Sequence, residues 1–348
     1  MRITALNRRA FEAPRDHLVH VLPTLEVSGC LSMATSLMSD LKGIYAHTLL
    51  FDSSLRDVDR HCVLYTRSCG AQVLHADLIT PEVIAAGGYT GAILYNVENR
   101  QGIGAVLPSL YYSHGIYDPN VVADLTVPSS TYAAKIDRRG NDLDLDPEWV
   151  IPPFLQTRSM RRVKGPTRPF TVGILTSGYM NKYPGEFVIQ MMHHLPDDTG
   201  IILNVMSEYP HPGVKLAIAD RQKRVGKSML AVPIMPSMAI RYLIGVDALI
   251  YAGAPDHHEP YGRLIVEAMA FGKAVICERR GAPAEYLEHG VNALLFDTPE
   301  EAVDHVARIQ KDTKARQMLG VNAQLWASWQ DSSAHIGRLK RALRMIGA

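Results

Sequence analysis

The chain has 348 residues, 47% of them hydrophobic, and 36 Lys and Arg balance 35 Asp and Glu. This length and apolar content suit two domains, and the balanced charge argues neither for nor against a nucleic-acid partner. No stretch reaches the ~18 apolar residues of a membrane span, Met1–Arg9 lack the long apolar core of a signal peptide, and the four cysteines lack metal-ligand spacing, so a cytoplasmic protein with reduced thiols is expected.

The first half of the chain alternates strands and helices after a basic extension, residues 1–17, that reads as irregular. Apolar runs predict strands at 18–22, 47–51, 71–75, 92–96, 109–113 and 125–128. Periodic segments predict helices at 30–41, 58–69 and 81–86. The alternation is typical of one doubly wound α/β domain, which we place at residues 18–155.

Prolines and basic residues over 156–168 indicate a linker, and a second alternating domain is expected at 169–330. Its predicted strands are 170–175, 201–205, 229–233, 246–252 and 274–277, and its predicted helices are 186–194, 238–244 and 262–271. The last segment, 331–348, has helical spacing over 332–346, and we expect this helix to pack back on the first domain.

The most informative segment places two carboxylates, Glu259 and Glu267, on either side of a helix start at Gly262. Glu259 follows a predicted buried strand, and open α/β sheets bind ligands at the carboxyl ends of their strands. The free N–H groups of a helix start suit a phosphate, and carboxylates accept hydrogen bonds from sugar hydroxyls. The pattern therefore indicates a nucleotide-sugar site. The alternative interpretation is that Glu267 pairs with Arg263 on a solvated helix face.

This segment resembles the nucleotide-sugar-binding motif of family 4 retaining glycosyltransferases, the glycosyl transferases group 1 of the GT-B fold. The matching residues are Glu259, Pro260, Gly262, Glu267, Ala268, Met269, Ala270 and Gly272. The resemblance implies two Rossmann-like domains whose parallel sheets face each other across a cleft. It also implies donor binding mainly in the second domain and no essential metal or cofactor beyond the nucleotide sugar.

The resemblance also assigns roles to individual residues. Glu259 would contact the donor sugar and stabilise positive charge at the anomeric carbon, and His114 would face that sugar as the second catalytic residue. Glu267 would bind the ribose hydroxyls. The remaining donor-binding candidates are Lys182, Ser177, Gly178, Tyr261, Gly262, Arg263 and Gly29, the last being the one glycine kept in a loop that the family makes glycine-rich.

One position departs from the family pattern. The family places an Arg five residues before the Lys that neutralises the leaving diphosphate; Lys182 matches the Lys, but Ser177 occupies the Arg position. Either Ser177, Gly178 and the backbone bind the phosphate, or another arginine such as Arg263 or Arg280 replaces the missing one. The departure also supports a second hypothesis, a catalytically weak or inactive nucleotide-sugar-binding partner of another transferase.

Other polar segments favour structural interpretations. We interpret Asp142–Asp146 as a solvated loop rather than a metal site, and His257 and His258 as cleft residues without zinc-site companions. Two basic clusters, at 158–168 and 221–227, read as solvated surface; the alternative is attraction to an anionic acceptor.

The leading hypothesis is a metal-independent retaining glycosyltransferase, a hexosyl- or pentosyltransferase, that uses a UDP-, GDP- or ADP-linked donor. The acceptor is expected to be a glycan or a lipid head group, the latter implying peripheral membrane contact, with nucleic acid the least favoured. A third hypothesis, a sugar-nucleotide epimerase of the same fold, is disfavoured by the Glu267–Ala270 match.

Overall fold

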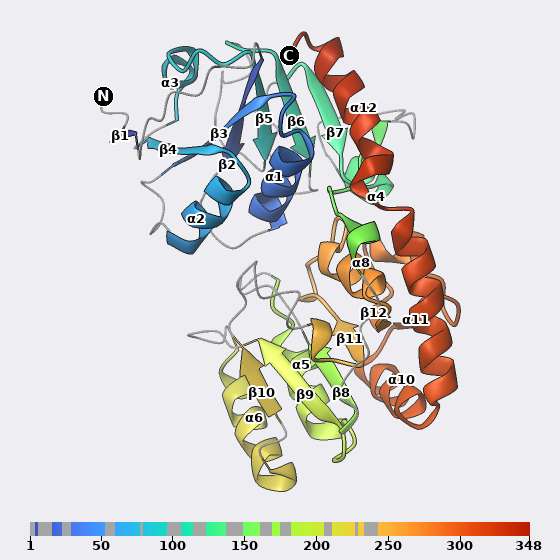
Figure 1. The fold of residues 1–348 in the computed structure, drawn as a ribbon. Coiled ribbons are helices and arrows are strands. Elements are labelled where there is room, and N and C mark those ends of the chain that lie inside the picture. Colours follow the sequence, from blue (N-terminus) through green and yellow to red (C-terminus); the bar gives the residue numbers. More distant parts are fainter. Residues whose placement is uncertain are drawn as a thin grey trace. The chain divides into compact units, whose positions relative to one another are not determined.

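In a computed structural model, the protein divides into two compact units. The first unit comprises Met1–Gln156 with Ser332–Ala348, and the second comprises Thr157–Asp331 (Figure 1). The structure describes residues 4–5, 16–22, 29–52, 60–76, 79–95, 106–113, 123–136, 149–160, 169–174, 182–204, 211–226, 229–232 and 243–348.

The first unit contains a seven-stranded sheet with the order β1-β4-β3-β2-β5-β6-β7 among its described residues. The strands are β1 Thr4–Ala5, β2 His17–Leu22, β3 Ala46–Asp52, β4 Gln72–Ala76, β5 Gly91–Tyr95, β6 Ser109–Ser113 and β7 Leu125–Pro128. From β4 to β7 all neighbours are parallel, as the alternating pattern predicts. The prediction that residues 1–17 are irregular is wrong at one point, because Thr4 and Ala5 form β1, which pairs antiparallel with β4.

The helices of the first unit are α1 Gly29–Asp40, α2 Arg60–Ser68, α3 Pro81–Ala85, α4 Thr131–Ile136 and α12 Ser332–Met345. The first three lie where the periodicity predicts them, whereas α4 was not predicted. The C-terminal helix α12 buries Leu339 and Leu343 in the same core as Ile151 and Phe154. Its first residue, Ser332, donates its N–H to the carbonyl of Leu155 at 2.7 Å.

The second unit contains a parallel sheet with the order β10-β9-β8-β11-β12-β13. The strands are β8 Thr171–Ile174, β9 Gly200–Asn204, β10 Met229–Val232, β11 Ala248–Tyr251, β12 Ala274–Glu278 and β13 Leu294–Phe296. The chain order reverses between β8 and β11, which is the topological switch point of a doubly wound sheet. A ligand site is therefore expected beyond the carboxyl ends of these two strands.

The helices of the second unit surround its sheet (Figure 1). They are η3 Thr157–Ser159 (one 3₁₀ turn), α5 Gly185–His194, α6 Pro212–Val225, α8 Arg263–Ala270, α9 Pro283–Tyr286, α10 Pro299–Lys311 and α11 Thr313–Ser328. Residues from α5, α6 and α10 share one core with Val172, Ile174 and Ile250 of the sheet. Most of the helix predicted at 238–244 lies outside the described residues.

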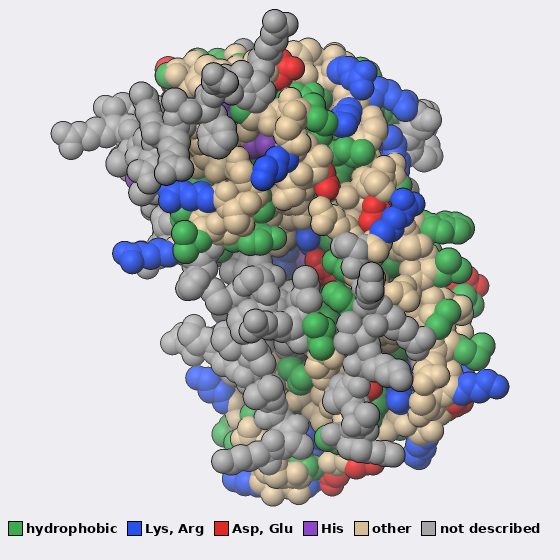
Figure 2. Space-filling model, viewed as in Figure 1, with side chains coloured by type: hydrophobic (Ala, Val, Ile, Leu, Met, Phe, Trp, Pro, Cys, Tyr) green, Lys and Arg blue, Asp and Glu red, His purple; other side chains and the backbone are tan. Residues whose placement is uncertain are grey.

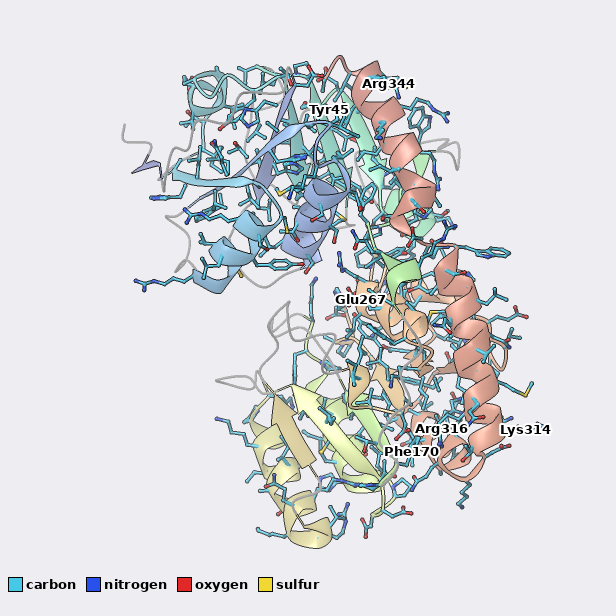
Figure 3. All side chains as sticks on the ribbon, in the orientation of Figure 1. Tyr45, Phe170, Glu267, Lys314, Arg316 and Arg344 are labelled. Atoms are coloured by element: carbon cyan, nitrogen blue, oxygen red, sulfur yellow. The ribbon has the colours of Figure 1, made fainter. Side chains whose placement is uncertain are left out.

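The helix α11 is joined to the sheet by an aromatic contact at one end. The guanidinium of Arg316 lies 4.9 Å from the ring centre of Phe170, just before β8 (Figure 3). The helix α11 exposes apolar side chains, including Met318, Val321 and Leu325. Figure 2 shows hydrophobic side chains along the right-hand edge of the molecule. No helix among the described residues is long and apolar enough to span a bilayer.

The interpretation of the second basic cluster as solvated surface is wrong for Arg221, which is 1% exposed. Its guanidinium donates to the carbonyls of Leu195 and Thr199 at 2.9 and 3.1 Å, and also to those of Met192 and Pro196. These carbonyls lie at and beyond the end of α5, where a helix leaves its last C=O groups without internal partners. Arg221 therefore joins α6 to α5, while residues 161–168 of the first cluster lie outside the described residues.

Candidate functional site

The candidate site is built on the loop that follows the central strand β11. Tyr251 ends this strand, Glu259 lies eight residues further on, and α8 begins at Arg263. A pocket of about 10 Å³, lined by Tyr251, His257, Glu259 and Arg280 among others, opens at this end of the sheet. The switch point between β8 and β11 thus carries the residues that the sequence singled out.

The carboxylate of Glu259 is held by donors from three places in the chain. Its Oε1 accepts the backbone N–H of Gly262 at 3.1 Å, and its Oε2 accepts the hydroxyl of Tyr251 at 2.5 Å. The Nε2 atom of His257 lies 3.5 Å from the same Oε2. The side chain is 21% exposed, so the carboxylate is oriented by the protein and still reaches the surface of the loop.

The pKa of Glu259 reports the balance of burial and donors around it. Burial raises the pKa, but the hydrogen bonds from His257 and Tyr251 and the positive charge of Lys182 outweigh it and lower the pKa to about 2. Burial, together with the negative charge of this carboxylate, holds the pKa of Tyr251 well above its ordinary value. Glu259 is therefore ionised and Tyr251 is a protonated donor at neutral pH.

The start of α8 depends on Gly262, which has a left-handed backbone with φ of 80°. A β-carbon there would lie 2.8 Å from Cδ1 of Ile265 and 2.9 Å from the hydroxyl of Tyr286. Only glycine fits this combination of positive φ and close approach. The helix start therefore presents its first-turn N–H groups next to Glu259, an arrangement suited to an anion.

The loop that follows β12 also contacts the backbone of Glu259. Gly281, three residues after β12, has φ of 68°, and a β-carbon there would lie 2.6 Å from the carbonyl oxygen of Glu259. The next residue, Ala282, donates its N–H to that same carbonyl at 2.9 Å. The backbone of Glu259 is therefore fixed by the loop after β12 as well as by its own loop.

Arg280 is occupied with the β11 loop. Its guanidinium donates to the carbonyls of Gly253 and Ala254 at 3.2 and 2.9 Å, to that of Pro255, and to the carboxylate of Glu278 at 2.8 Å. Glu278 in turn accepts the N–H of Gly253 at 3.1 Å. Through these contacts Arg280 stabilises the loop that carries Glu259. Its guanidinium is therefore engaged by the loop instead of being available to a phosphate.

Arg263 and Glu267 form an ion pair one turn apart on α8. The Nε of Arg263 donates to Oε1 of Glu267 at 2.8 Å, and Figure 3 labels Glu267 on this helix. The pair predicted by the alternative interpretation thus exists, but its side chains are only 22% and 14% exposed, so it does not lie on a solvated face.

Lys182 reaches the site from the segment after β8. Its carbonyl accepts the N–H of Ala254 at 3.1 Å, which joins this segment to the β11 loop. The charge of Lys182 also contributes to lowering the pKa of Glu259. The structure therefore brings Lys182 together with Glu259, Tyr261, Gly262, Arg263 and Glu267.

The other predicted site residues lie outside the described residues or belong to the first unit. Ser177 and Gly178 of the second unit and His114 of the first unit lie outside the described residues, as do Asp142–Asp146. Gly29 is the first residue of α1 in the first unit. Among the described residues no group of three or more His, Cys, Asp or Glu is placed to hold a metal ion.

Sequence reasoning missed the roles of Tyr251, Gly281 and Arg280. Tyr251 was assigned only to a buried strand, although a polar end on the last residue of a central strand is a signal for the ligand edge. Gly281 and Arg280 act across neighbouring strands, and no local pattern in the sequence specifies those contacts.

The comparison with protein families matches the segment that carries this site. Residues 242–326 match the family model described as "Glycosyl transferases group 1". A "Probable sucrose-phosphate synthase" of Thermosipho melanesiensis is 26% identical over 177 residues, which cover 48% of this chain and 42% of that protein. The matched region is thus less than half of the curated relative.

Solved structures match over nearly the whole chain. HepE from Anabaena, in complex with UDP and glucose, superposes with a TM-score of 0.76 at 17% identity and covers 95% of this chain and 100% of its own. A sucrose-phosphate synthase from Thermosynechococcus elongatus gives a TM-score of 0.68 at 14% identity, with 94% and 99% covered. These likenesses and the two parallel sheets define the GT-B fold. The chain thus has the GT-B fold, and the segment that carries the candidate site is similar to the glycosyl transferases of group 1.

Proposed function

We propose that the protein transfers a sugar from a nucleotide-sugar donor to an acceptor with retention of the anomeric configuration and without a metal ion. The observation that carries the proposal is the ionised, oriented carboxylate of Glu259 beside the start of α8 at the switch point. Glycosyl transfer passes through an oxocarbenium-like state, which a fixed negative charge stabilises. Glu259 supplies that charge.

In this proposal the nucleotide-sugar donor is bound by groups that lie around Glu259. The N–H groups at the start of α8 and the ammonium of Lys182 suit a diphosphate, and the carboxylate of Glu267, oriented by Arg263, suits ribose hydroxyls. We place a UDP-linked sugar first among donors, because HepE was solved with UDP, with UDP and glucose, and with UDP-glucose. The leaving diphosphate takes the acceptor proton, and no protein nucleophile is required.

The acceptor is proposed to be a glycan, a lipid head group or, least favoured, a nucleic acid. A sugar phosphate joins this set, since the curated relative is named a probable sucrose-phosphate synthase. The absence of any membrane-spanning helix among the described residues is compatible with each of these acceptors. A panel of acceptors decides between them once a donor is known.

A second candidate function is nucleotide-sugar binding without turnover, in support of another transferase. It is favoured by Ser177 in the family's Arg position and by the engagement of both replacement arginines, Arg280 with loop carbonyls and Arg263 with Glu267. In this candidate the donor binds, but too little positive charge meets the leaving diphosphate for transfer.

One experiment separates the two functions. Thermal unfolding is measured with UDP-, GDP- and ADP-linked sugars, because a bound ligand raises the melting temperature, and the stabilising donor is then assayed for transfer and hydrolysis. Glu259→Gln is expected to lower turnover about a hundredfold or more, whereas Glu288→Gln, an exposed glutamate of the same unit, keeps it. Turnover that survives Glu259→Gln contradicts the assigned role; donor binding without any turnover favours the second function.

A further inference from the structure

The phenol of Tyr251 contacts Glu259 from the end of a central strand of the second unit. Tyr251 ends β11, which is hydrogen-bonded to β8 on one side and to β12 on the other, and it lies opposite Cys277 in the β12 register. Its hydroxyl donates to Oε2 of Glu259 over 2.5 Å. The hydroxyl of Tyr251 is thus positioned by a central strand, whereas Glu259 itself lies in a loop.

The two oxygens of Glu259 have different supports. Oε1 accepts a backbone N–H, from Gly262, which no substitution of a side chain removes. Oε2 has Tyr251 at 2.5 Å and His257 at 3.5 Å, so the short contact comes from the phenol alone. Among the side chains around Glu259, the phenol of Tyr251 therefore makes the closest contact with the carboxylate.

We infer that Tyr251 is a positioning residue for Glu259: its hydroxyl fixes Oε2 while the Gly262 N–H fixes Oε1, which keeps the carboxylate ionised and aimed at the reacting sugar. This inference rests on the proposed function and adds a residue to it. Tyr251 touches neither donor nor acceptor in this scheme and acts only through Glu259.

The chemistry of the pair supports this role. Hydrogen bonds to an ionised acceptor are short and strong, and they favour the charged form of the carboxylate. Burial and the neighbouring Glu259 hold the pKa of Tyr251 well above its ordinary value, so the phenol remains a donor throughout the working pH range. A carboxylate without this donor is easier to protonate, and its Oε2 keeps only the 3.5 Å contact with His257.

The decisive variant is Tyr251→Phe, which removes one oxygen and keeps the ring. The matched control is Tyr89→Phe, a tyrosine of the first unit that is partly buried and is not part of the site. Both proteins are checked for wild-type melting and circular dichroism. If Tyr251→Phe is unstable, the coupling between Tyr251→Phe and Glu259→Gln is measured by a double-mutant cycle of unfolding free energies, and additive effects overturn the inference.

The first measurement does not depend on turnover. The side-chain carboxyl carbon of Glu259 is assigned by NMR with Glu259→Gln and followed to acid pH. At pH 3 a carboxyl with a pKa of about 2 is about one-tenth protonated, and a rise of about one unit makes it about half protonated. We expect this change in Tyr251→Phe and not in Tyr89→Phe. An unchanged titration overturns the inference.

The second measurement is transfer kinetics with the donor found above. Tyr251→Phe is expected to lower kcat about tenfold or more while KM for the donor changes less than about threefold, because an oriented charge acts mainly in the transition state. A shifted titration with wild-type kcat overturns the positioning role. If the wild-type protein transfers no sugar, the proposed function fails, and the NMR titration still decides whether Tyr251 controls Glu259.

Discussion

Arg263 and Glu267 are joined by a 2.8 Å hydrogen bond on α8 although both side chains are largely buried. Exposed pairs of this spacing contribute little to stability, because solvent screens them. Here the burial weakens the screening, and the pair fixes the carboxylate that is proposed to meet the ribose. The ion pair and the proposed ligand role of Glu267 are therefore compatible, because Arg263 orients the Glu267 carboxylate before the donor binds.

Arg263→Met should weaken both the fold and donor binding. Removing the guanidinium leaves a largely buried carboxylate without its partner, so we expect the free energy of unfolding to fall by about 1–3 kcal/mol and the donor Kd to rise. Lys223→Met is the control, since its pair with Asp220 is 80% and 58% exposed and should change stability by less than about 0.5 kcal/mol. Urea unfolding and donor titration measure the two effects. Equal results for both variants would contradict this account.

The ionisation of Glu259 predicts a specific pH dependence of stability. Its folded pKa of about 2 lies below the ordinary value of 4.5, so its stabilising contribution is fully present above pH 4.5 and is lost as the pH falls toward 2. A difference of this size corresponds to about 3 kcal/mol at most. Wild type should therefore lose its advantage over Glu259→Gln between these values. The difference in the free energy of unfolding between wild type and Glu288→Gln is the reference. If the difference between wild type and Glu259→Gln stays constant down to the lowest pH at which both proteins fold, the assignment is wrong.

The sequence predicted the strands of both sheets well, because nearly every buried strand is a short apolar run between turns. It also placed Glu259 at a strand end and a helix at 262–271, which the structure gives as Arg263–Ala270. These features depend on neighbours a few residues apart, and local patterns carry that information.

The contacts that orient the site could not be predicted in the same way. Gly281 meets Glu259, 22 positions earlier, because β11 and β12 pair in one register and their loops leave the sheet side by side. Arg221 looks like a surface cation in the sequence, and its burial is determined by where α5 ends. Such contacts follow from the assembled fold, since a local pattern does not specify which loops meet.

Gly281→Ala should displace Glu259. The added β-carbon would lie 2.6 Å from the Glu259 carbonyl oxygen and 2.9 Å from its nitrogen, so backbone must move. Gly290→Ala is a matched control, because Gly290 has φ of 80° and nothing within 4 Å of the added carbon. We expect Gly290→Ala to cost about 1 kcal/mol of stability, and Gly281→Ala to cost more and also to lower kcat. Thermal unfolding and transfer assays measure both; an active Gly281→Ala protein as stable as Gly290→Ala would rule out the clash.

The first unit should be sensitive to mild acid because of a buried histidine pair. Nε2 of His20 lies 3.0 Å from Nδ1 of His47, and Nδ1 of His20 lies 3.1 Å from the hydroxyl of Tyr95. Burial is the main cause that lowers the pKa of both histidines, to about 4 for His47. Above pH 6.5 both are neutral in the folded and unfolded chains, so they add no pH dependence. Between pH 6.5 and 4 the unfolded chain binds protons that the folded chain excludes. The free energy of unfolding therefore decreases as the pH is lowered through this range.

The variant His47→Gln tests this directly, because it removes one of the two buried imidazoles. We expect a smaller fall in the free energy of unfolding between pH 7 and pH 4.5 than in wild type, by up to about 2 kcal/mol, whatever its stability at pH 7. His258→Gln, at an exposed position of the second unit, should keep the wild-type slope. Unfolding is followed by denaturant titration at a series of pH values. If the His47→Gln and wild-type slopes coincide, the pair does not set the acid response, since removing a buried titrating group must change the number of protons taken up on unfolding.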